Sequence, residues 1–423
     1  MTPEIEKRIK AVKAGRVPAA HCLDGKKSQW NHLQISDLFD EVCEKNHPDA
    51  DVLTIIQGTG TVLREESGRE IIYDENSLAS YKFVKKDDFI IHLRSFEGGL
   101  EVANQDGIVS PAYIILRPKI DVSTVYLYAL FHSNQFINQT MAPAVEGARD
   151  GRSVKYDVLK KQKIFLPPLS EQKKIAEILS AQDKIIELKE KLIAEKQRQK
   201  KYLMSVLLGD DFKKPFKLNG VTIDKKKWEK KRIEDVAIMS SGSTPRRDSK
   251  DNFCGNILWL SSGELKQKYI CDTEEKISDK AAKESNLRVY PEGTFVIAMY
   301  GLEAAGIRGT ASIIKAKSTI SQACMAFTDL NNITNEFLYY WYLYNGQIIG
   351  SKYAQGSKQQ NLNSDLMGKI QINLPSLPEQ KAIADVLSAA DEEISLLQKD
   401  LEQEKLKKKS LMQLLLTGLV RVA

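Results

Sequence analysis

The sequence predicts an α+β protein in which two globular domains, related by a pseudo-two-fold, are separated by two long antiparallel coiled-coil helices. The main observation is an internal repeat: LPPLSEQKKIAEILSAQD begins at Leu166, and LPSLPEQKAIADVLSAAD begins at Leu374. A repeat at about half the chain length indicates a pseudo-symmetric molecule, because solenoids repeat every few tens of residues. Such a molecule suits a two-fold partner, such as duplex DNA or a pair of identical subunits.

Helical periodicity runs through both copies of the repeat. Apolar residues recur every seven positions, at Leu179, Ile186 and Ile193 in the first copy and at Leu387, Ile394 and Leu401 in the second. A heptad seam of this kind predicts coiled-coil packing. Residues 170–208 as one helix would be about 58 Å long at 1.5 Å per residue, and Gly209 and Gly418 supply stop signals. Antiparallel packing of the two copies is the simplest way to cover both apolar stripes.

Two segments of similar size lie outside the repeats and show strand patterns. VLTIIQ, FIIHL and PAYIILRP predict strands in the first, and NILWL, GTFVIAMY and ASIIKA predict strands in the second. Three landmarks correspond: residues 30–37 with 228–235, VKKDDFIIHL with VYPEGTFVIAM, and VSTVYLYALF with ITNEFLYYWY. The loops differ far more than these landmarks. Similar scaffolds with dissimilar loops are what we expect of two modules that recognise different sequences.

These boundaries divide the chain into five parts. We expect an N-terminal helix that packs near the C-terminal one, a first globular domain, a first long helix, a second globular domain and a second long helix. Their expected extents are residues 1–17, 18–160, 161–212, 213–367 and 368–423.

Composition and charge narrow the protein class. No apolar run approaches the roughly 18 residues of a membrane span, and the charged start lacks the apolar stretch of a signal peptide, so we expect a cytoplasmic protein with no membrane contact. Five scattered cysteines without a CxxC pair predict reduced thiols and no metal site. The net charge of +6 permits a nucleic-acid partner. Basic runs at residues 196–201, 225–232 and 405–409 are either solvated helix faces or phosphate contacts.

Catalytic motifs are missing from the sequence. It has no phosphate-loop motif, no HExxH and no amino-methyltransferase motif, and GTG at residues 58–60 predicts only a turn. All five histidines lie in the first half, which excludes a catalytic histidine shared by both repeats. We therefore predict a binding platform with no catalytic and no metal-binding residues, rather than an enzyme.

Three motifs carry a resemblance to one family. They are the doubled LP-x-L-x-EQ-x-x-IA-x-[IV]-LS-x-x-D before a long helix, SGSTPRRDSKDNFCGNILWLSSGEL at residues 241–265, and GSKQQNLNSDLMGKIQINLPSLPEQ at residues 356–380. With these motifs the chain resembles the DNA-specificity (S) subunit of type I restriction-modification systems over nearly its whole length. The first domain departs from the pattern, because it lacks the second domain's opening motif and has GARDGRSVKYD where the second has its Gln-Gln-Asn-Leu loop.

The resemblance implies a concrete function. Each globular domain would be a target-recognition domain for one half of a bipartite site in double-stranded DNA, and the paired helices would set the spacer. The helices would dock two methyltransferase (M) subunits, which use S-adenosylmethionine, and two restriction (R) subunits would join with ATP and Mg. The chain itself would hold no cofactor. Two other functions remain open: a stand-alone DNA-binding regulator, and a structural scaffold that does not bind DNA.

Base recognition needs side chains with hydrogen-bond donors and acceptors on loops or helix ends. In the first domain we predict DNA contacts at Gln57, Thr59, Arg64, Arg94, Arg149, Arg152 and Lys155. In the second domain we predict them at Thr244, Arg246, Arg247, Ser261, Ser262, Tyr300, Arg308, Lys358, Gln359 and Asn361. The two neighbouring arginines could equally touch phosphate alone, which positions a protein without specifying sequence.

Two further groups of residues have competing interpretations. For methyltransferase docking we predict the first turns of the repeated helices, at Glu171, Gln172, Ile175, Glu379, Gln380 and Ile383. Helix capping and coiled-coil packing are at least as strong an interpretation for these side chains, and the two roles can coexist. The aromatic run over residues 339–342 could stack on bases, but its place in a helix favours the core.

Overall fold

The computed structural model describes residues 30–68, 75–91, 98–147, 153–210, 212, 214–301, 306–353 and 361–422. The helix predicted over residues 1–17 lies outside these residues. The described residues up to Glu190 and from Lys399 onward form one compact unit, and Lys191–Gln398 form a second. Each unit therefore contains one globular domain and a segment of each repeated helix.

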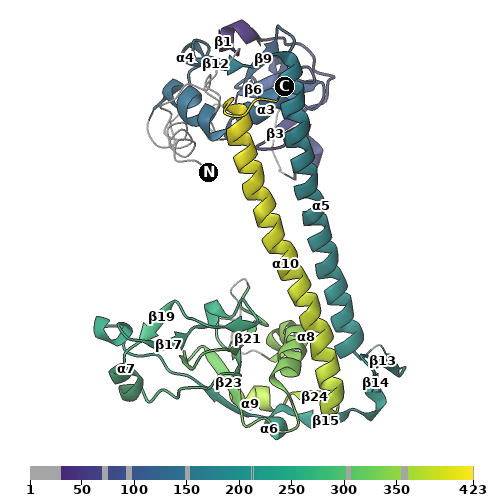
Figure 1. The fold of residues 1–423 in the computed structure, drawn as a ribbon, viewed down its shortest axis with the longest axis vertical. Helices are drawn as coiled ribbons and strands as arrows, with labels where there is room; N and C mark the ends of the chain where they lie inside the picture. The colour runs from purple at the N-terminus through teal and green to yellow at the C-terminus, as the bar shows by residue number, and fades with distance from the viewer. Residues whose placement is uncertain are drawn as a thin grey trace. The chain divides into compact units, whose positions relative to one another are not determined.

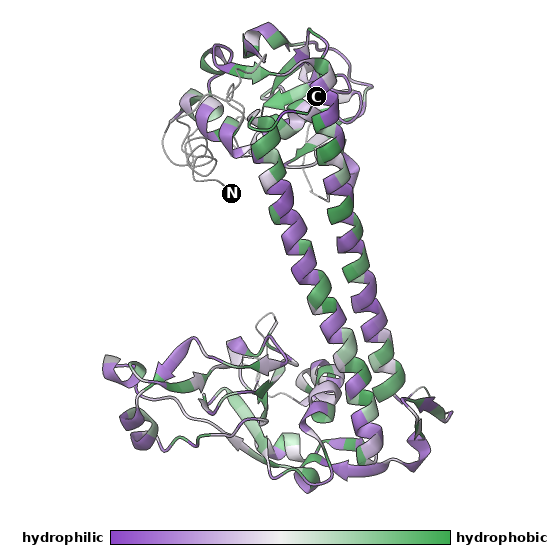
Figure 2. Ribbon diagram, in the orientation of Figure 1, coloured by the Kyte–Doolittle hydropathy of each residue, from purple (hydrophilic) through white to green (hydrophobic). Residues whose placement is uncertain are grey.

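The two copies of the repeat form the long helices α5 (Leu169–Leu208) and α10 (Leu377–Leu416), each of 40 residues. Five of the six predicted seam residues are buried: Leu179, Ile193, Leu387, Ile394 and Leu401. Figure 2 shows hydrophobic and hydrophilic residues alternating along both helices. Helix α5 ends directly before Gly209, and α10 ends two residues before Gly418, close to the predicted stop signals. None of the helices in the described part of the chain is long and apolar enough to cross a membrane.

The helix segments within each unit run antiparallel. In the first unit Asp183 and Lys189 of α5 pair with Lys408 and Asp400 of α10, so position numbers rise on one helix as they fall on the other. In the second unit Lys200 of α5 pairs with Asp391 of α10. These two residues are the repeat equivalents of Lys408 and Asp183, which pair in the first unit with the helices exchanged. The predicted antiparallel pairing is therefore confirmed within each unit.

The basic runs are used mainly inside the chain. Lys196 pairs with Glu393, and Lys405 pairs with Glu190 at 3.1 Å. Lys225 donates to backbone carbonyls at the end of α5. Some residues of these runs are thus engaged in ion pairs and helix capping within the chain, and phosphate contact stays a prediction for the exposed ones.

The first globular domain is built on an antiparallel sheet in the order β2-β9-β6-β7. Its strands are β2 (Phe39–Val42), β9 (Ile114–Pro118), β6 (Phe89–Ile91) and β7 (Leu100–Val102). Helix α3 (Thr124–Phe131) packs on the sheet, with the rings of Phe131 and Phe89 5.2 Å apart. Smaller pairs are β1 (Asn31–Gln34) with β12 (Lys163–Leu166), β3 (Leu53–Ile56) with β4 (Gly60–Leu63), β5 (Lys82–Val84) with β8 (Gly107–Val109), and β10 (Val145–Glu146) with β11 (Ser153–Val154). Short helices are α2 (Ile35–Leu38) and α4 (Tyr156–Leu159).

The second domain repeats this frame and extends it. Its main sheet has the order β16-β23-β20-β21-β18, formed by β16 (Ile238–Ser241), β23 (Cys324–Thr328), β20 (Phe295–Ala298), β21 (Ala311–Ile314) and β18 (Tyr269–Ile270). Helix α8 (Asn335–Tyr353) packs on it (Figure 1). Residues 339–342 of α8 are at most 6% exposed, so the predicted core role of this aromatic run is confirmed.

The remaining elements of the second unit are short. A separate sheet joins β17 (Ile257–Leu260), β19 (Glu275–Ile277) and β22 (Ser318–Ile320). Two-stranded pairs are β13 (Phe216–Leu218) with β14 (Val221–Ile223) and β15 (Glu229–Arg232) with β24 (Gln371–Leu374). Short helices are α6 (Ile233–Val236), α7 (Asp279–Glu284) and α9 (Ser364–Gly368). The pair β15–β24 and helix α6 match β1–β12 and α2 of the first domain, as the similarity of residues 30–37 to 228–235 predicts.

Candidate nucleic-acid interface

Each globular domain is fastened to a long helix by a tryptophan and a glutamate. The indole N–H of Trp30 donates to Glu171 at 3.1 Å, and the indole of Trp228 donates to Glu379 at 3.1 Å. The two glutamates are equivalent in the internal repeat. Arg421 adds two bonds of 2.6 Å to Glu171, which offsets the cost of burying that carboxylate.

The glutamine that follows each glutamate secures the helix on the sheet. Gln172 Oε1 accepts from the backbone N–H of Ser123 at 2.9 Å, just before α3. Gln380 Oε1 accepts from Thr334 at 2.9 Å, just before α8. The same two contacts in both domains make this a repeated structural joint.

These contacts change the interpretation of the residues predicted to dock a methyltransferase. The six side chains are between 0 and 8% exposed: Glu171, Gln172, Ile175, Glu379, Gln380 and Ile383. Their hydrogen bonds and packing are used within this chain, so they offer no surface to a partner subunit. In the structure these side chains stabilise the first turns of the long helices and pack them against the globular domains. Docking stays a prediction only for the exposed faces beside them.

Four strand ends lie side by side at one end of each main sheet, and we call this end of the sheet the loop edge. In the second domain antiparallel pairing puts side by side Ser241, Cys324, Ala298 and Ala311. In the first domain it does the same for Val42, Ile114, Ile91 and Leu100. Loops that leave the same edge of a sheet can act on one ligand together.

Backbone hydrogen bonds draw the loops of the second domain together at this edge. Four amide-to-carbonyl bonds of 2.8–3.2 Å join Ser243 to Ile320, Ser321 to Leu260, Met299 to Ala323 and Leu362 to Met299. The loops joined here, with the β20–β21 loop that leaves the same edge, carry Thr244, Ser261, Ser262, Tyr300, Arg308 and Asn361. The structure thus places these six predicted DNA contacts in loops at the same end of the sheet. Lys358 and Gln359 lie outside the described residues.

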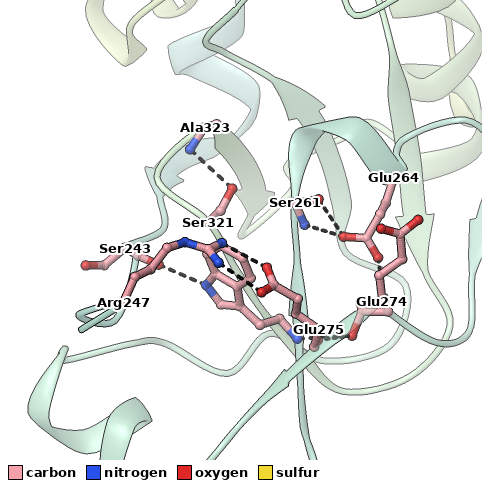
Figure 3. Close-up of polar contacts among 10 residues, drawn as sticks. Ser243, Arg247, Ser261, Glu264, Glu274, Glu275, Ser321 and Ala323 are labelled. Carbon is pink, nitrogen blue, oxygen red and sulfur yellow. Dashed lines mark hydrogen bonds and ion pairs between the residues drawn. The ribbon is translucent and has the colours of Figure 1, made fainter. Parts of the chain in front are cut away.

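The neighbouring arginines of the second domain differ in their surroundings. Arg247 forms two bonds of 2.9 Å to the carboxylate of Glu275 (Figure 3). Its guanidinium also lies over the rings of Phe253 and Trp259. The hydrogen bond to Arg247 holds the pKa of Glu275 below its ordinary value. Arg246 is exposed, and its side chain has no hydrogen bond or ion pair to any described residue. Arg247 therefore braces the loop, while Arg246 is the one open to a phosphate or a base.

A second local bond limits Ser261. Its hydroxyl and its backbone N–H both donate to Glu264, at 2.6 and 2.8 Å (Figure 3). This arrangement caps a short turn, so the hydroxyl is already engaged. Ser262, the next residue along the turn, is half-buried beside it.

The predicted contacts of the first domain are more scattered. Gln57 and Thr59 are exposed on the turn between β3 and β4, which confirms the turn predicted for residues 58–60. Arg64 lies at the opposite end of this hairpin, where its backbone N–H donates to Val52. It is half-buried, with its guanidinium 5.8 Å from the centre of the Tyr81 ring. Arg64 therefore does not join Gln57 and Thr59 in one site.

The remaining predicted contacts of the first domain cannot be grouped with the turn. Lys155 is exposed at the start of α4. Arg94, Arg149 and Arg152 lie outside the described residues.

Three residues that support the turn between β3 and β4 were not predicted from the sequence. Glu101, Asn104 and His132 contact this turn or one another, although they are distant from it in sequence. One signal was available: Glu101 is a single acid between apolar residues in the strand sequence LEV.

Two copies of one α+β frame, each with its own polar loops at the loop edge, define a recognition protein with two modules. The chain belongs to the family of type I restriction modification DNA specificity domains, whose model matches residues 27–197 and again 225–406. Its function is accordingly sequence-specific DNA recognition within a type I restriction-modification system, which assembles with other subunits.

Similarity to known specificity subunits supports this assignment. The chain is 27% identical to the MjaVIII specificity subunit of Methanocaldococcus jannaschii over 91% of this chain and 88% of that one. It is 31% identical to the MjaIX specificity subunit of the same organism, over 40% of this chain and 38% of that protein. A solved chain from a study of the assembly of a type I R-M system matches with a TM-score of 0.62 and 17% identity, over 92% of this chain and 98% of that chain. This last likeness concerns the fold alone.

Proposed function

We propose that this chain recognises a bipartite site in double-stranded DNA, with one globular domain for each half-site. The observation that carries the proposal is the repeated frame with dissimilar loop edges. The Trp–Glu and Gln joints recur in both domains, whereas the polar residues at the two loop edges differ. Dissimilar loops on equal frames are what two different half-sites require.

The partners follow from the proposed function. The paired segments of α5 and α10 act as the spacer between half-sites, and their exposed faces dock two methyltransferase subunits. Those subunits bring S-adenosylmethionine for methylation of adenine, and two restriction subunits bring ATP and Mg. The chain itself holds no cofactor and acts as the non-catalytic specificity subunit in the cytoplasm, where the DNA is.

The test is adenine-methylation mapping in cells that express this chain with the neighbouring methyltransferase subunit, compared with cells that lack only this chain. We expect a split methylated motif that appears only when the chain is present. If the methyltransferase is expressed and competent but no chain-dependent motif appears, the proposal fails. A DNA-binding regulator or a scaffold would then account for the fold.

The spacer role has its own test. Deleting seven residues from each long helix removes one heptad from both and keeps the seam in register. The two half-sites should stay the same while the distance between them changes. An unchanged distance in a folded variant would refute the spacer role and leave half-site recognition intact.

A further inference from the structure

The turn between β3 and β4 is an exposed turn held by a buried carboxylate and an exposed amide. Glu101, on β7, is only 2% exposed, and its carboxylate accepts the backbone N–H groups of Gly58 at 2.7 Å and Gly60 at 3.1 Å. Asn104 donates to the carbonyl oxygens of Thr59 and Thr61, both at 2.9 Å. The backbone of the turn is therefore fixed from both sides.

The surroundings of Glu101 keep its carboxylate in place. His132 Nε2 lies 3.2 Å from the carboxylate, and its Nδ1 lies 2.8 Å from the carbonyl oxygen of Tyr128. Both ring nitrogens of His132 therefore lie within hydrogen-bond distance of oxygen atoms. A buried carboxylate that accepts two backbone N–H groups is costly to move, because each lost donor leaves it unsatisfied.

Backbone space is as restricted as the hydrogen bonds. Gly60 has a φ of 92°, and a Cβ there would lie 2.5 Å from the carbonyl oxygen of Val102. A Cβ on Gly98 would lie 2.2 Å from the side-chain nitrogen of Gln57. The turn is thus pressed against β7, and Gln57 lies beside the residues that lead into this strand at the loop edge.

The two side chains at the tip of the turn are available to contact another molecule. Gln57 and Thr59 are exposed, and neither side chain has a hydrogen-bond partner among the described residues. An amide and a hydroxyl supply both donors and acceptors, which is the chemistry needed to distinguish base edges in a DNA groove. Rigid backbone beneath exposed, uncommitted polar groups is what preorganised recognition requires.

The second domain uses the equivalent strand position in the same way. Glu101 pairs with Ile90 in the β6–β7 ladder, and Ser312 pairs with Val296 in the β20–β21 ladder. The hydroxyl of Ser312, which is fully buried, donates to the carbonyl oxygen of Gln267 at 2.6 Å. In each domain a side chain at this strand position thus holds a neighbouring segment through hydrogen bonds to its backbone.

We propose that the turn over residues 57–60 is the base-recognition element of the first domain, and that Glu101 and Asn104 are its positioning residues. The inference rests on the proposed function and deepens it, since it assigns one half-site to one named turn. Gln57 and Thr59 contact the DNA, while Glu101 and Asn104 act only through the geometry of the turn.

The experiment maps the methylated motif for single variants of the full chain, expressed with the methyltransferase subunit. Gln57→Ala and Thr59→Ala should relax one or two base positions in one half-site only. Glu101→Gln and Asn104→Ala should relax the same positions, because the turn loses its fixed backbone. Lys119→Ala, at the opposite edge of the sheet, should leave both half-sites unchanged.

A second measurement separates positioning from general damage. Hydrogen exchange at the amides of Gly58 and Gly60 should rise roughly tenfold or more in Glu101→Gln, because each amide loses or weakens a bond to a charged acceptor. Asn104 is exposed, so Asn104→Ala loosens the turn without opening the core and serves if Glu101→Gln fails to fold. Ser312→Ala is the matched variant, and it should affect only the other half-site.

The outcomes distinguish this inference from the proposed function. A wild-type chain that produces no split motif refutes the proposed function itself. A split motif that all four turn variants leave unchanged overturns the assignment of the turn. Faster exchange at Gly58 and Gly60 without any change in the half-site would overturn the positioning role of Glu101 and Asn104.

Discussion

The first and second globular domains use different side chains at the same strand position to hold a loop segment in place. In the first, the β3–β4 turn is held by a buried carboxylate at Glu101; in the second, the segment before β18 is held by a hydroxyl at Ser312. Beneath these segments the order of the four shared strands and the Trp–Glu joint are the same. The difference shows that the frame keeps its positions while the groups at the loop edge change, so specificity can vary without a new fold.

The largest effect should come from the shared frame. Phe89 and Phe295 hold equivalent places in β6 and β20, and both are fully buried. Replacing either with alanine should lower the free energy of unfolding by about 3–5 kcal/mol, through lost burial and the cavity left behind. Denaturant titration measures the loss.

Matched surface variants test whether the comparison holds. Leu188→Ala and Leu396→Ala are equivalent in the repeat and lie at positions 52% and 58% exposed, so each should change stability by less than about 0.5 kcal/mol. A large loss from Phe89→Ala with almost none from Phe295→Ala would show that the two frames are not energetically equivalent.

The next largest effect should distinguish the two joints. Glu171 receives a bidentate bond from Arg421, whereas Glu379 receives bonds from the indole of Trp228 and from Ser376. Glu171→Gln should therefore cost about 2–4 kcal/mol, and Glu379→Gln about 1–2 kcal/mol. A double-mutant cycle of Glu171→Gln with Arg421→Gln isolates the charged pair, and a coupling energy near zero would contradict this ranking.

Two neighbouring arginines should separate stability from DNA binding. Arg247→Ala removes the pair with Glu275 and should loosen the segment around β19, seen as faster hydrogen exchange there. Arg246→Ala should leave stability within about 0.5 kcal/mol but weaken DNA binding by the assembled complex by about 1 kcal/mol or more. If Arg246 contacts only phosphate, the loss of affinity should be the same for all DNA sequences. The slope of log binding constant against log salt concentration should then become shallower by about one. Equal exchange and equal affinity for both variants would contradict the division of roles.

A smaller effect should appear in acid, at the joint of the second domain. Burial pushes the pKa of Glu379 upward, but hydrogen bonds from Ser376, Asp224 and Trp228 outweigh it and hold the pKa below the ordinary value of 4.5. A carboxylate whose pKa is lowered by folding stabilises the fold at pH values above its unfolded-state pKa. This stabilisation is lost as the pH falls through the folded-state pKa. The stability advantage of wild type over Glu379→Gln should therefore be constant near neutral pH and shrink below about pH 4.5. An advantage that persists at lower pH would show that Glu379 is not held as the carboxylate.

Periodic features of the fold were predictable from sequence, and contacts at the loop edges were not. The helix pair follows from a heptad seam, and the paired Trp motifs at residues 30–37 and 228–235 mark equivalent strands. Ile185 and Leu192, although apolar and spaced along a helix, are 38% and 42% exposed. Periodicity predicts an apolar stripe, but only the packing determines which part of a wide stripe is covered.

Site residues were harder to predict because chemistry alone does not place a side chain. Arg64 and Gln57 both suit base recognition by type, yet they lie at opposite ends of one hairpin. Arg247 has the right chemistry but is already paired with Glu275. Glu101 lies more than 40 residues from the glycines that it holds, so its place among apolar residues could mark it as unusual but could not identify its partners.

The smallest effect should again differ between the two units. The repeat-equivalent pairs Asp183–Lys408 and Asp391–Lys200 join the helix segments, but Asp391 also accepts the hydroxyl of Tyr340 at 2.7 Å. Asp183→Asn should cost about 0.2–1 kcal/mol, as for partly exposed ion pairs, and Asp391→Asn should cost somewhat more, because a buried tyrosine loses a charged acceptor. Added salt should reduce the first loss more than the second, since exposed charges are screened more strongly. If salt affects both variants equally, the tyrosine contributes nothing to the second pair, and the helix segments of the two units are equivalent in energy as well as in sequence.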